Sequence, residues 1–221
     1  MINPCMSEPL SLLGEPKHKV REKRAVSLVA VVSIAGLVGG LLTAGLDYRL
    51  SRLRLPGRYH LFSPGLFGVP LGVTLPISLI VGGLLRAFGT LWKTFSIVVL
   101  SSLAYLVSYW AAVGVELVSG KRQLMDQYPS YSPLSLFTGG FFGGFLVLYG
   151  VLLLIHPRQI CASLMFKILL SSVVAGGLGI VGWSLGAEHS LFIVWQTGTA
   201  FLLGLILQSL QSRPVTRPAV Q

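Results

Sequence analysis

The chain has 221 residues, of which 53% are hydrophobic and only 11% are charged, and its mean hydropathy is +0.76. Because soluble domains carry roughly 25% charged residues, this composition excludes a soluble globular protein and predicts an integral membrane protein. The net charge of +10 comes from 17 basic against 7 acidic residues. The basic residues lie mainly beside apolar stretches, which favours anionic lipid headgroups over nucleic acid as their partner.

Separate apolar runs of about 20 residues predict a bundle of membrane-spanning helices. Residues 1–24 form a basic tail and residues 211–221 a second tail. The first apolar run is too long for the core of a signal peptide, so we expect a retained helix. We predict an all-α fold, a polytopic membrane helix bundle in residues 25–210. Its six transmembrane helices are Ala25–Leu46, Leu66–Leu85, Phe95–Val115, Leu134–Ile155, Leu164–Leu185 and Leu191–Leu210.

An Arg-rich segment, DYRLSRLRLPGR, precedes the second predicted span. It alternates arginines with leucines, so it could lie in the interface with its basic face toward lipid headgroups. The alternative is that these arginines form a rim that an anionic substrate passes. The arginines concerned are Arg49, Arg52, Arg54 and Arg58.

The second predicted span contains Pro70 and Pro76. Proline provides no N–H to the helix and clashes with the preceding turn, so we predict a Pro-kinked second helix. The carbonyls freed by a kink at membrane depth need neighbouring helices or a polar cavity as partners. Both prolines are therefore candidates for the wall of a ligand cavity. The alternative is that residues 56–83 re-enter the membrane without crossing it.

Counting basic residues gives the predicted orientation. Six spans place 11 Lys and Arg on the side of both termini and 6 on the opposite side. Five spans, with a re-entrant second run, give a weaker division of 10 against 7. The positive-inside rule therefore favours six spans with both termini in the cytoplasm. Cys5 and Cys161 then face the cytoplasm, where we expect reduced thiols.

Two polar residues, one at the edge of a predicted span and one deep inside another, could carry chemistry. Glu116 follows the third span and ends a stripe of small residues spaced by four on one helix face, Ala104, Ser108 and Ala112. It could form a cation or proton site, or an ion pair that fixes the outer loops. Gln196 is an amide deep within the sixth span. It could bind a polar ligand, or it could form an interhelical hydrogen bond.

Glycines recur at a spacing of four, which lets helix backbones approach closely where the hydrophobic effect does not drive association. We favour packing within the bundle. The alternative is a face for a second copy or another membrane protein, with the fourth span as the best candidate. The glycines are Gly36, Gly40, Gly139, Gly140, Gly143 and Gly144.

Several motifs of known chemistry are missing from the chain. There is no HExxH or CxxC spacing and no Walker loop, which argues against a metal hydrolase and an ATPase. The four histidines (18, 60, 156 and 189) lie outside the middle of any predicted span, so we expect no haem. We predict no cofactor and no metal, and an enzyme is the less favoured class.

Two functions remain. The first is a small-solute or ion transporter, or the membrane component of one. Its site would lie near the broken second helix. The candidate cavity residues are Pro70, Pro76, Glu116 and Gln196. The second is a non-catalytic accessory or scaffold subunit that packs against other membrane proteins through its glycine faces.

Overall fold

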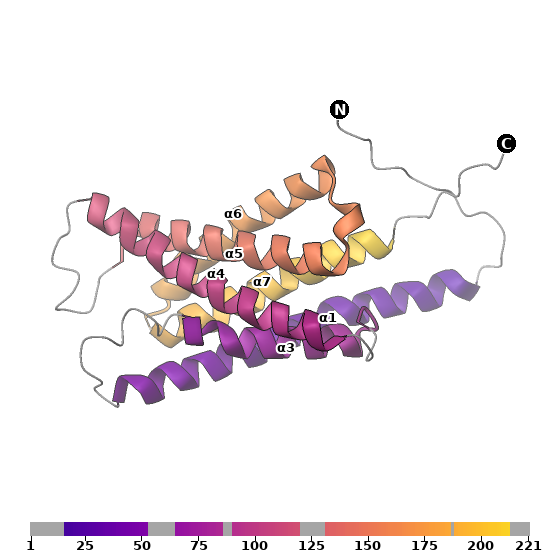
Figure 1. Cartoon of the computed structure of the whole chain (residues 1–221), viewed down its shortest axis with the longest axis horizontal. Helices are drawn as coiled ribbons and strands as arrows, with labels where there is room; N and C mark the ends of the chain where they lie inside the picture. The colour runs from indigo at the N-terminus through magenta and orange to yellow at the C-terminus, as the bar shows by residue number, and fades with distance from the viewer. Residues whose placement is uncertain (1–15, 53–64, 86–89, 120–130, 187, 213–221) are drawn as a thin grey trace.

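The computed structural model describes residues 16–52, 65–85, 90–119, 131–186 and 188–212. Within these ranges the chain forms six α-helices and one short 3-10 helix, without a strand (Figure 1). The predicted all-α helix bundle is confirmed. The elements are α1 (Pro16–Arg52), α3 (Gly68–Val81), α4 (Thr90–Val118), α5 (Pro133–Ile155), η1 (Pro157–Gln159), α6 (Ala162–Ser184) and α7 (Glu188–Gln211).

Helix α1 starts at Pro16, ahead of the predicted boundary at Ala25, so residues 16–24 of the predicted basic tail belong to a helix. Residues 1–15 and 213–221 of the predicted tails lie outside the described part. Five segments are long and apolar enough to cross a membrane: Leu28–Arg49, Leu91–Val118, Pro133–Ile155, Ala162–Ser184 and Ser190–Gln211. The protein is thus a multi-pass membrane protein.

Helix α3 is shorter, with 14 residues, yet it follows α1 through most of its apolar length. At one end the Thr43 hydroxyl donates to the Phe67 carbonyl, just before α3, at 3.1 Å. At the other end a β-carbon added to Gly82 would lie 2.6 Å from Leu28 Cδ1. Leu28 and Thr43 are separated by about 22 Å of helix. This depth favours a crossing segment over a re-entrant one.

The prolines of α3 lie at two different kinds of position. Pro70 is in the first turn, where its missing N–H has no partner within the helix in any case. Pro76 lies inside the helix and is buried. The helix ends at Val81, and Gly83, two residues on, has a φ of +72°, which suits a residue without a side chain. The Leu84 N–H then donates to the Leu79 carbonyl at 2.8 Å, the bond of a Schellman cap.

The six helices form a closed ring. Around it the order is α1, α3, α4, α5, α6 and α7, and α7 packs on α1 to complete the circle. Helix α5 also contacts α7 across the ring. The interior is filled mainly by apolar side chains from all six helices, among them Val32, Leu71, Leu75, Ile97, Leu148, Ile168 and Leu203.

Glycines set the spacing between α1 and α7. A β-carbon on Gly36 would overlap the Ala200 side chain and lie 2.7 Å from the Gln196 carbonyl oxygen. A β-carbon on Gly40 would lie 2.7 Å from Ile193 Cα. Real side chains do not approach so closely, so this contact requires glycine at both positions.

The glycines of α5 face two neighbours in the same way. On the α4 side, a β-carbon on Gly139 would lie 2.8 Å from the Ser108 carbonyl oxygen, and one on Gly143 would lie 3.0 Å from Ser108 Cβ. On the α6 side, Gly140 and Gly144 face Ala175, at 2.8 Å from its carbonyl oxygen and 2.6 Å from its Cβ. All six glycines singled out from the sequence therefore lie against helices of the same chain.

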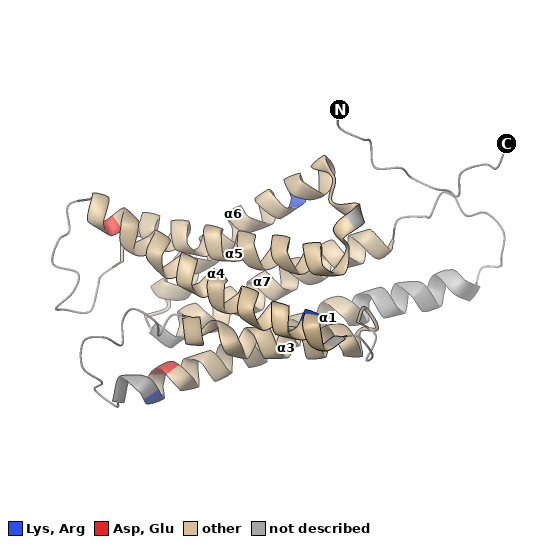
Figure 2. Cartoon of the chain, in the orientation of Figure 1, with Lys and Arg blue, Asp and Glu red and all other residues tan. Residues whose placement is uncertain are grey.

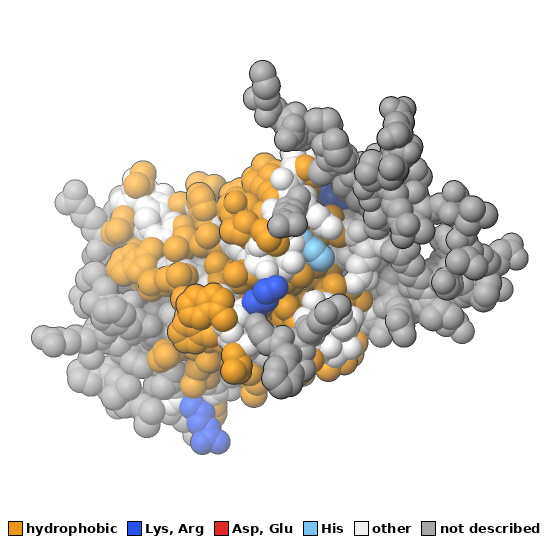
Figure 3. All heavy atoms as spheres, turned by 45° about the vertical axis from the view of Figure 1, so that its right-hand side comes forward, with side chains coloured by type: hydrophobic (Ala, Val, Ile, Leu, Met, Phe, Trp, Pro, Cys, Tyr) orange, Lys and Arg blue, Asp and Glu red, His pale blue; other side chains and the backbone are white. Residues whose placement is uncertain are grey.

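Charge and polarity follow the geometry of a membrane bundle. The charged side chains that the structure describes lie toward the ends of the helices, and the middle of each helix has none (Figure 2). The described outer surface is largely apolar (Figure 3), with exposed residues such as Ile34, Ile77, Leu103 and Val174. Such a surface fits a lipid bilayer, because water-soluble proteins rarely expose so much contiguous apolar area.

The ring predicts different tolerance at two glycines of α1. Gly36→Val should lower the free energy of unfolding by about 1–3 kcal/mol, because the new side chain collides with α7. Gly45→Val is the matched control, since no atom lies within 4 Å of its added β-carbon. Unfolding in mixed detergent micelles measures both. Equal stability of the two variants would show that the close contact between α1 and α7 is not required.

Candidate functional site

A fully buried amide, Gln196, links three helices inside the ring. Its Nε2 donates to Thr43 Oγ1 of α1 at 2.8 Å and also to the hydroxyl of Tyr105 on α4. Thr43 in turn donates to the carbonyls of Gly39, at 2.9 Å, and Phe67, at 3.1 Å. The amide therefore stands where α1, α4 and α7 meet the start of α3.

Helix periodicity explains how the amide enters the ring. Gln196 and Ala200 are four residues apart, so they share the face of α7 that lies on α1. The glycines at 36 and 40 let this face approach. Thr43 is four residues beyond Gly39 on α1, so both face the amide. The interhelical hydrogen bond expected at Gln196 is present, and ligand binding there stays a prediction.

The other end of the amide is unusual. Gln196 Oε1 is buried and has no hydrogen-bond partner in the described part of the chain. A β-carbon on Gly39 would lie 2.8 Å from this oxygen and 3.0 Å from Thr74 Oγ1. Thr74 uses its own proton on the carbonyls of Pro70, at 3.0 Å, and Leu71, at 3.3 Å. Two acceptor atoms thus converge beside Gly39.

Aromatic rings surround the polar groups on the α4 and α7 sides. The Tyr105 ring meets Trp195 edge-on at 5.1 Å and Phe192 at 6.3 Å, and Phe192 meets Phe67 at 5.3 Å. The Trp195 indole donates to the Gly140 carbonyl at 3.2 Å. In these apolar surroundings each hydrogen bond is stronger than in water, and an acceptor without a partner costs more.

The second helix reaches the amide between its two prolines. Thr74 lies on α3 between Pro70 and Pro76, and it faces the side of Gly39 that Gln196 occupies. The structure thus brings the helix that carries Pro70 and Pro76 to Gln196, through Thr74. Pro76 itself is buried in helix packing.

Glu116 lies elsewhere. Helix α3 packs on α4 at Ser101, where a β-carbon on Gly72 would lie 3.3 Å from Ser101 Cβ, and Glu116 is 15 residues further along α4. That separation is about 22 Å. The structure therefore does not bring Glu116 to the prolines or to Gln196.

Glu116 is instead a capping residue. It is fully buried, and its Oε1 accepts the backbone N–H of Ser132. Ser132 is the N-cap of α5, with its hydroxyl accepting from Ser135 N at 3.3 Å and with Pro133 next in the chain. A carboxylate at a helix N-terminus is stabilised by the free N–H groups there. This contact joins the end of α4 to the start of α5.

Of the predicted arginine rim, Arg49 is exposed near the end of α1. The side chain of Arg52 and all of Arg54 and Arg58 lie outside the described residues. Their contact with lipid headgroups or an anionic substrate stays a prediction.

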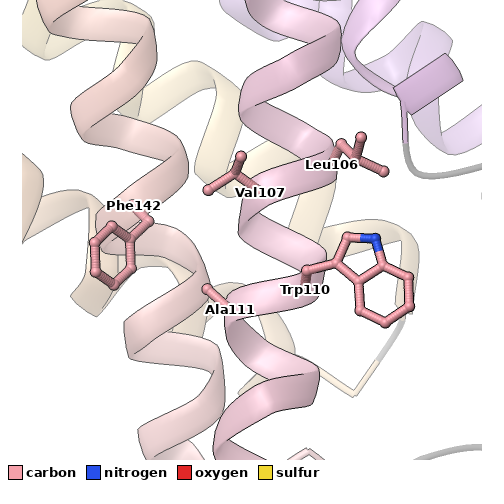
Figure 4. A pocket seen from close by; sticks show the side chains of 5 residues that line it. All are labelled: Leu106, Val107, Trp110, Ala111 and Phe142. Atoms are coloured by element: carbon pink, nitrogen blue, oxygen red, sulfur yellow. The ribbon is translucent and has the colours of Figure 1, made fainter.

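A shallow groove of about 360 Å³ lies outside the ring, between α4 and α5 (Figure 4). Its walls are apolar: Val107 and Ala111 lie on the side of α4 toward α5, Phe142 comes from α5, and Leu106 and Trp110 project from the other side of α4. The groove is separate from the amide, which is on the inner side of the ring.

Comparison with known proteins gives no relative. No protein-family model matches the chain, and no curated protein or solved structure matches it. Among the described residues, no group of three or more His, Cys, Asp or Glu side chains is placed to hold a metal ion. The hydrogen-bond geometry inside the ring therefore carries the functional argument.

Sequence reasoning singled out Gln196 but missed the residues around it. Thr43, Thr74 and Tyr105 are all polar side chains within predicted helices, and each is common enough in membrane helices to pass unnoticed. The available signal was the spacing of four between Gly39 and Thr43, which places a hydroxyl beside a position without a side chain.

Cys161, the N-cap residue of α6, is disulfide-bonded. The expectation of a reduced thiol at this position is therefore wrong. Disulfides persist in oxidising compartments, whereas the distribution of basic residues places this end of the bundle in the cytoplasm. The two observations favour opposite sides, so the cytoplasmic location of the termini stays a prediction.

His156 lies at the same end, directly after α5. The backbone N–H of His156 donates to the Leu152 carbonyl at 2.8 Å and caps the helix. The side chain is half-buried, and its Nε2 has no hydrogen-bond partner in the part of the chain described. Burial and, secondarily, the charge of Lys93 lower the pKa of His156 below its usual 6.5.

This lowered pKa predicts a pH dependence of stability. Below pH 6.5 the unfolded chain binds a proton at His156 before the folded chain does, so stability falls as the pH drops toward the folded-state pKa. The loss should be smaller in His156→Gln. Thermal unfolding above and below pH 6.5 compares the two proteins, and an unchanged pH profile in the variant would contradict the assignment.

Proposed function

We propose that this protein is a small-solute transporter, or the membrane component of one, in which the solute meets Gln196 inside the helix ring. The observation that supports this is the fully buried amide whose Oε1 has no hydrogen-bond partner among the described residues. A hydrogen bond between membrane helices stabilises by about 0.6 kcal/mol on average, so the two that Gln196 donates only match the low end of the cost of about 1–3 kcal/mol for an unpaired buried acceptor. Fold stability alone thus gives little reason for an amide here.

In this proposal α3 is the element that opens the site. It is the shortest of the described α-helices and carries both prolines. Its start is held to α1 by one side-chain hydrogen bond, from Thr43 to Phe67. Short or proline-interrupted membrane segments border the binding sites of many secondary transporters, and α3 resembles them in its length and its prolines.

Substitution of the amide tests the proposal. In proteoliposomes carrying the protein, a panel of small solutes should include at least one whose flux exceeds that of empty vesicles. Gln196→Leu should lower this flux by about tenfold or more, because it removes a hydrogen bond made in the dry interior. Gln208→Leu is the matched control, since Gln208 is an amide on the same helix and only partly buried.

Two results would count against transport through this site. One is a panel without any protein-dependent flux. The other is equal flux for Gln196→Leu and the wild-type protein, which would leave the amide a purely structural link between α1, α4 and α7.

A second candidate function is an accessory or scaffold subunit, and the groove between α4 and α5 favours it. The six glycines that the sequence offered as a docking face lie inside the ring, whereas the groove is on the outside and apolar. An occupant in contact with it would be an apolar transmembrane helix of another subunit.

Site-specific crosslinking separates the two functions. A photo-reactive residue at Ala111, in the groove, should crosslink to one defined membrane protein in native membranes. The same residue at Val181, which is exposed on α6, should react with lipid. Lipid adducts at both positions would contradict the scaffold function and leave transport unaffected.

A further inference from the structure

The polar hydrogen atoms of Gln196 and Thr43 are already in use. Both amide hydrogens are donated, one to Thr43 Oγ1 and one to the Tyr105 hydroxyl. The hydroxyl hydrogen of Thr43 goes to the backbone carbonyls of Gly39 and Phe67. What remains of the amide is its acceptor, Oε1.

Thr74 presents the same polarity on the opposite helix. Its hydroxyl hydrogen is donated within α3, to the carbonyl of Pro70 at 3.0 Å. Its lone pairs stay available beside Gly39, next to Gln196 Oε1. Two oxygen acceptors therefore face one spot, and glycine has no side-chain donor to offer them. A ligand at this spot must supply N–H or O–H groups.

The charge of the ligand follows from the surroundings. Charged side chains with a described position lie within about two turns of a helix end, and the nearest along α1 is Asp47, one turn beyond Thr43. The walls at the amide are aromatic and aliphatic. Moving an ion there without a charged partner costs several kcal/mol, so the site favours an uncharged molecule.

Space limits the size of the ligand. The point where a β-carbon of Gly39 would stand is 2.8 Å from Gln196 Oε1, 3.0 Å from Thr74 Oγ1 and 3.2 Å from Leu71 Cα. A methyl group alone would already be crowded. No ligand atom fits at this point as the helices stand, so α3 must shift before the hydrogen-bearing end of a small molecule can reach both acceptors.

We propose that the solute of this site is a small uncharged hydrogen-bond donor, of the size and kind of urea, whose N–H or O–H groups pair with Gln196 Oε1 and Thr74 Oγ1. This inference rests on the proposed transport function. It adds the chemical class of the solute and assigns Thr74 as a residue that contacts it.

Three probes of similar size separate the features of the class. Urea is uncharged and donates N–H groups, dimethyl sulfoxide is uncharged and only accepts, and guanidinium donates N–H groups but is charged. In stopped-flow measurements on proteoliposomes, urea should show flux above that of empty vesicles. Dimethyl sulfoxide and guanidinium should not.

Thr74→Val keeps the shape of the side chain and removes its oxygen. It should lower urea flux by about fivefold, as expected for one lost hydrogen bond between uncharged groups. The matched control is Thr138→Val, because Thr138 donates to the Leu134 carbonyl in the same way but is exposed on α5. Unchanged thermal unfolding of both variants shows that the fold is intact.

Each outcome bears on a separate statement. Protein-dependent flux of dimethyl sulfoxide equal to that of urea overturns the requirement for a donor, and flux of guanidinium overturns the exclusion of charge. Equal urea flux in Thr74→Val and Thr138→Val removes Thr74 from the site. If urea is not carried but another solute of the wider panel is, and Gln196→Leu abolishes that flux, the proposed transport function stands and the solute class is wrong.

Discussion

The close approach of the first and last helices is the constraint on which the rest of the structure depends. In lipid, helices gain little from burying apolar surface against one another, so contact depends on backbones coming close together. Gly36 and Gly40 of α1 allow this against Ala200 and Ile193 of α7. Because α1 and α7 are the two ends of the series of helices, their contact closes the ring and places Thr43 beside Gln196.

Helix α4 supplies the third member of the polar cluster because it packs on two neighbouring helices. On the α3 side Gly72 faces Val98 and Ser101, and on the α5 side Gly150 faces Leu100 and Gly139 faces Ser108. Tyr105 lies between these two contacts. Its side chain is therefore free to enter the ring, where it meets the amide and the Trp195 ring.

The fold could be predicted from the sequence further than the site could. The apolar runs placed all six helices, because length and lack of charge are dictated by the bilayer. Gln196 was recognisable as an amide within an apolar run. Thr43 and Thr74 were not, because a threonine in a helix commonly bonds its own backbone, and its second role appears only when another helix arrives. The partner of Glu116 is a backbone N–H at Ser132, which no side-chain pattern reveals.

The side-chain hydrogen bond between α1 and the start of α3 can be released at little cost. The Thr43 hydroxyl has two acceptors, the Phe67 carbonyl before α3 and the Gly39 carbonyl in its own helix. If α3 moves away, the hydroxyl hydrogen keeps its bond to Gly39, so little hydrogen-bond energy is lost on the α1 side. Thr43 Oγ1 also stays in position as an acceptor for Gln196 Nε2. The same movement carries Thr74 away from Gln196 Oε1, so opening would separate the two acceptors that the proposed solute bridges and would favour its release.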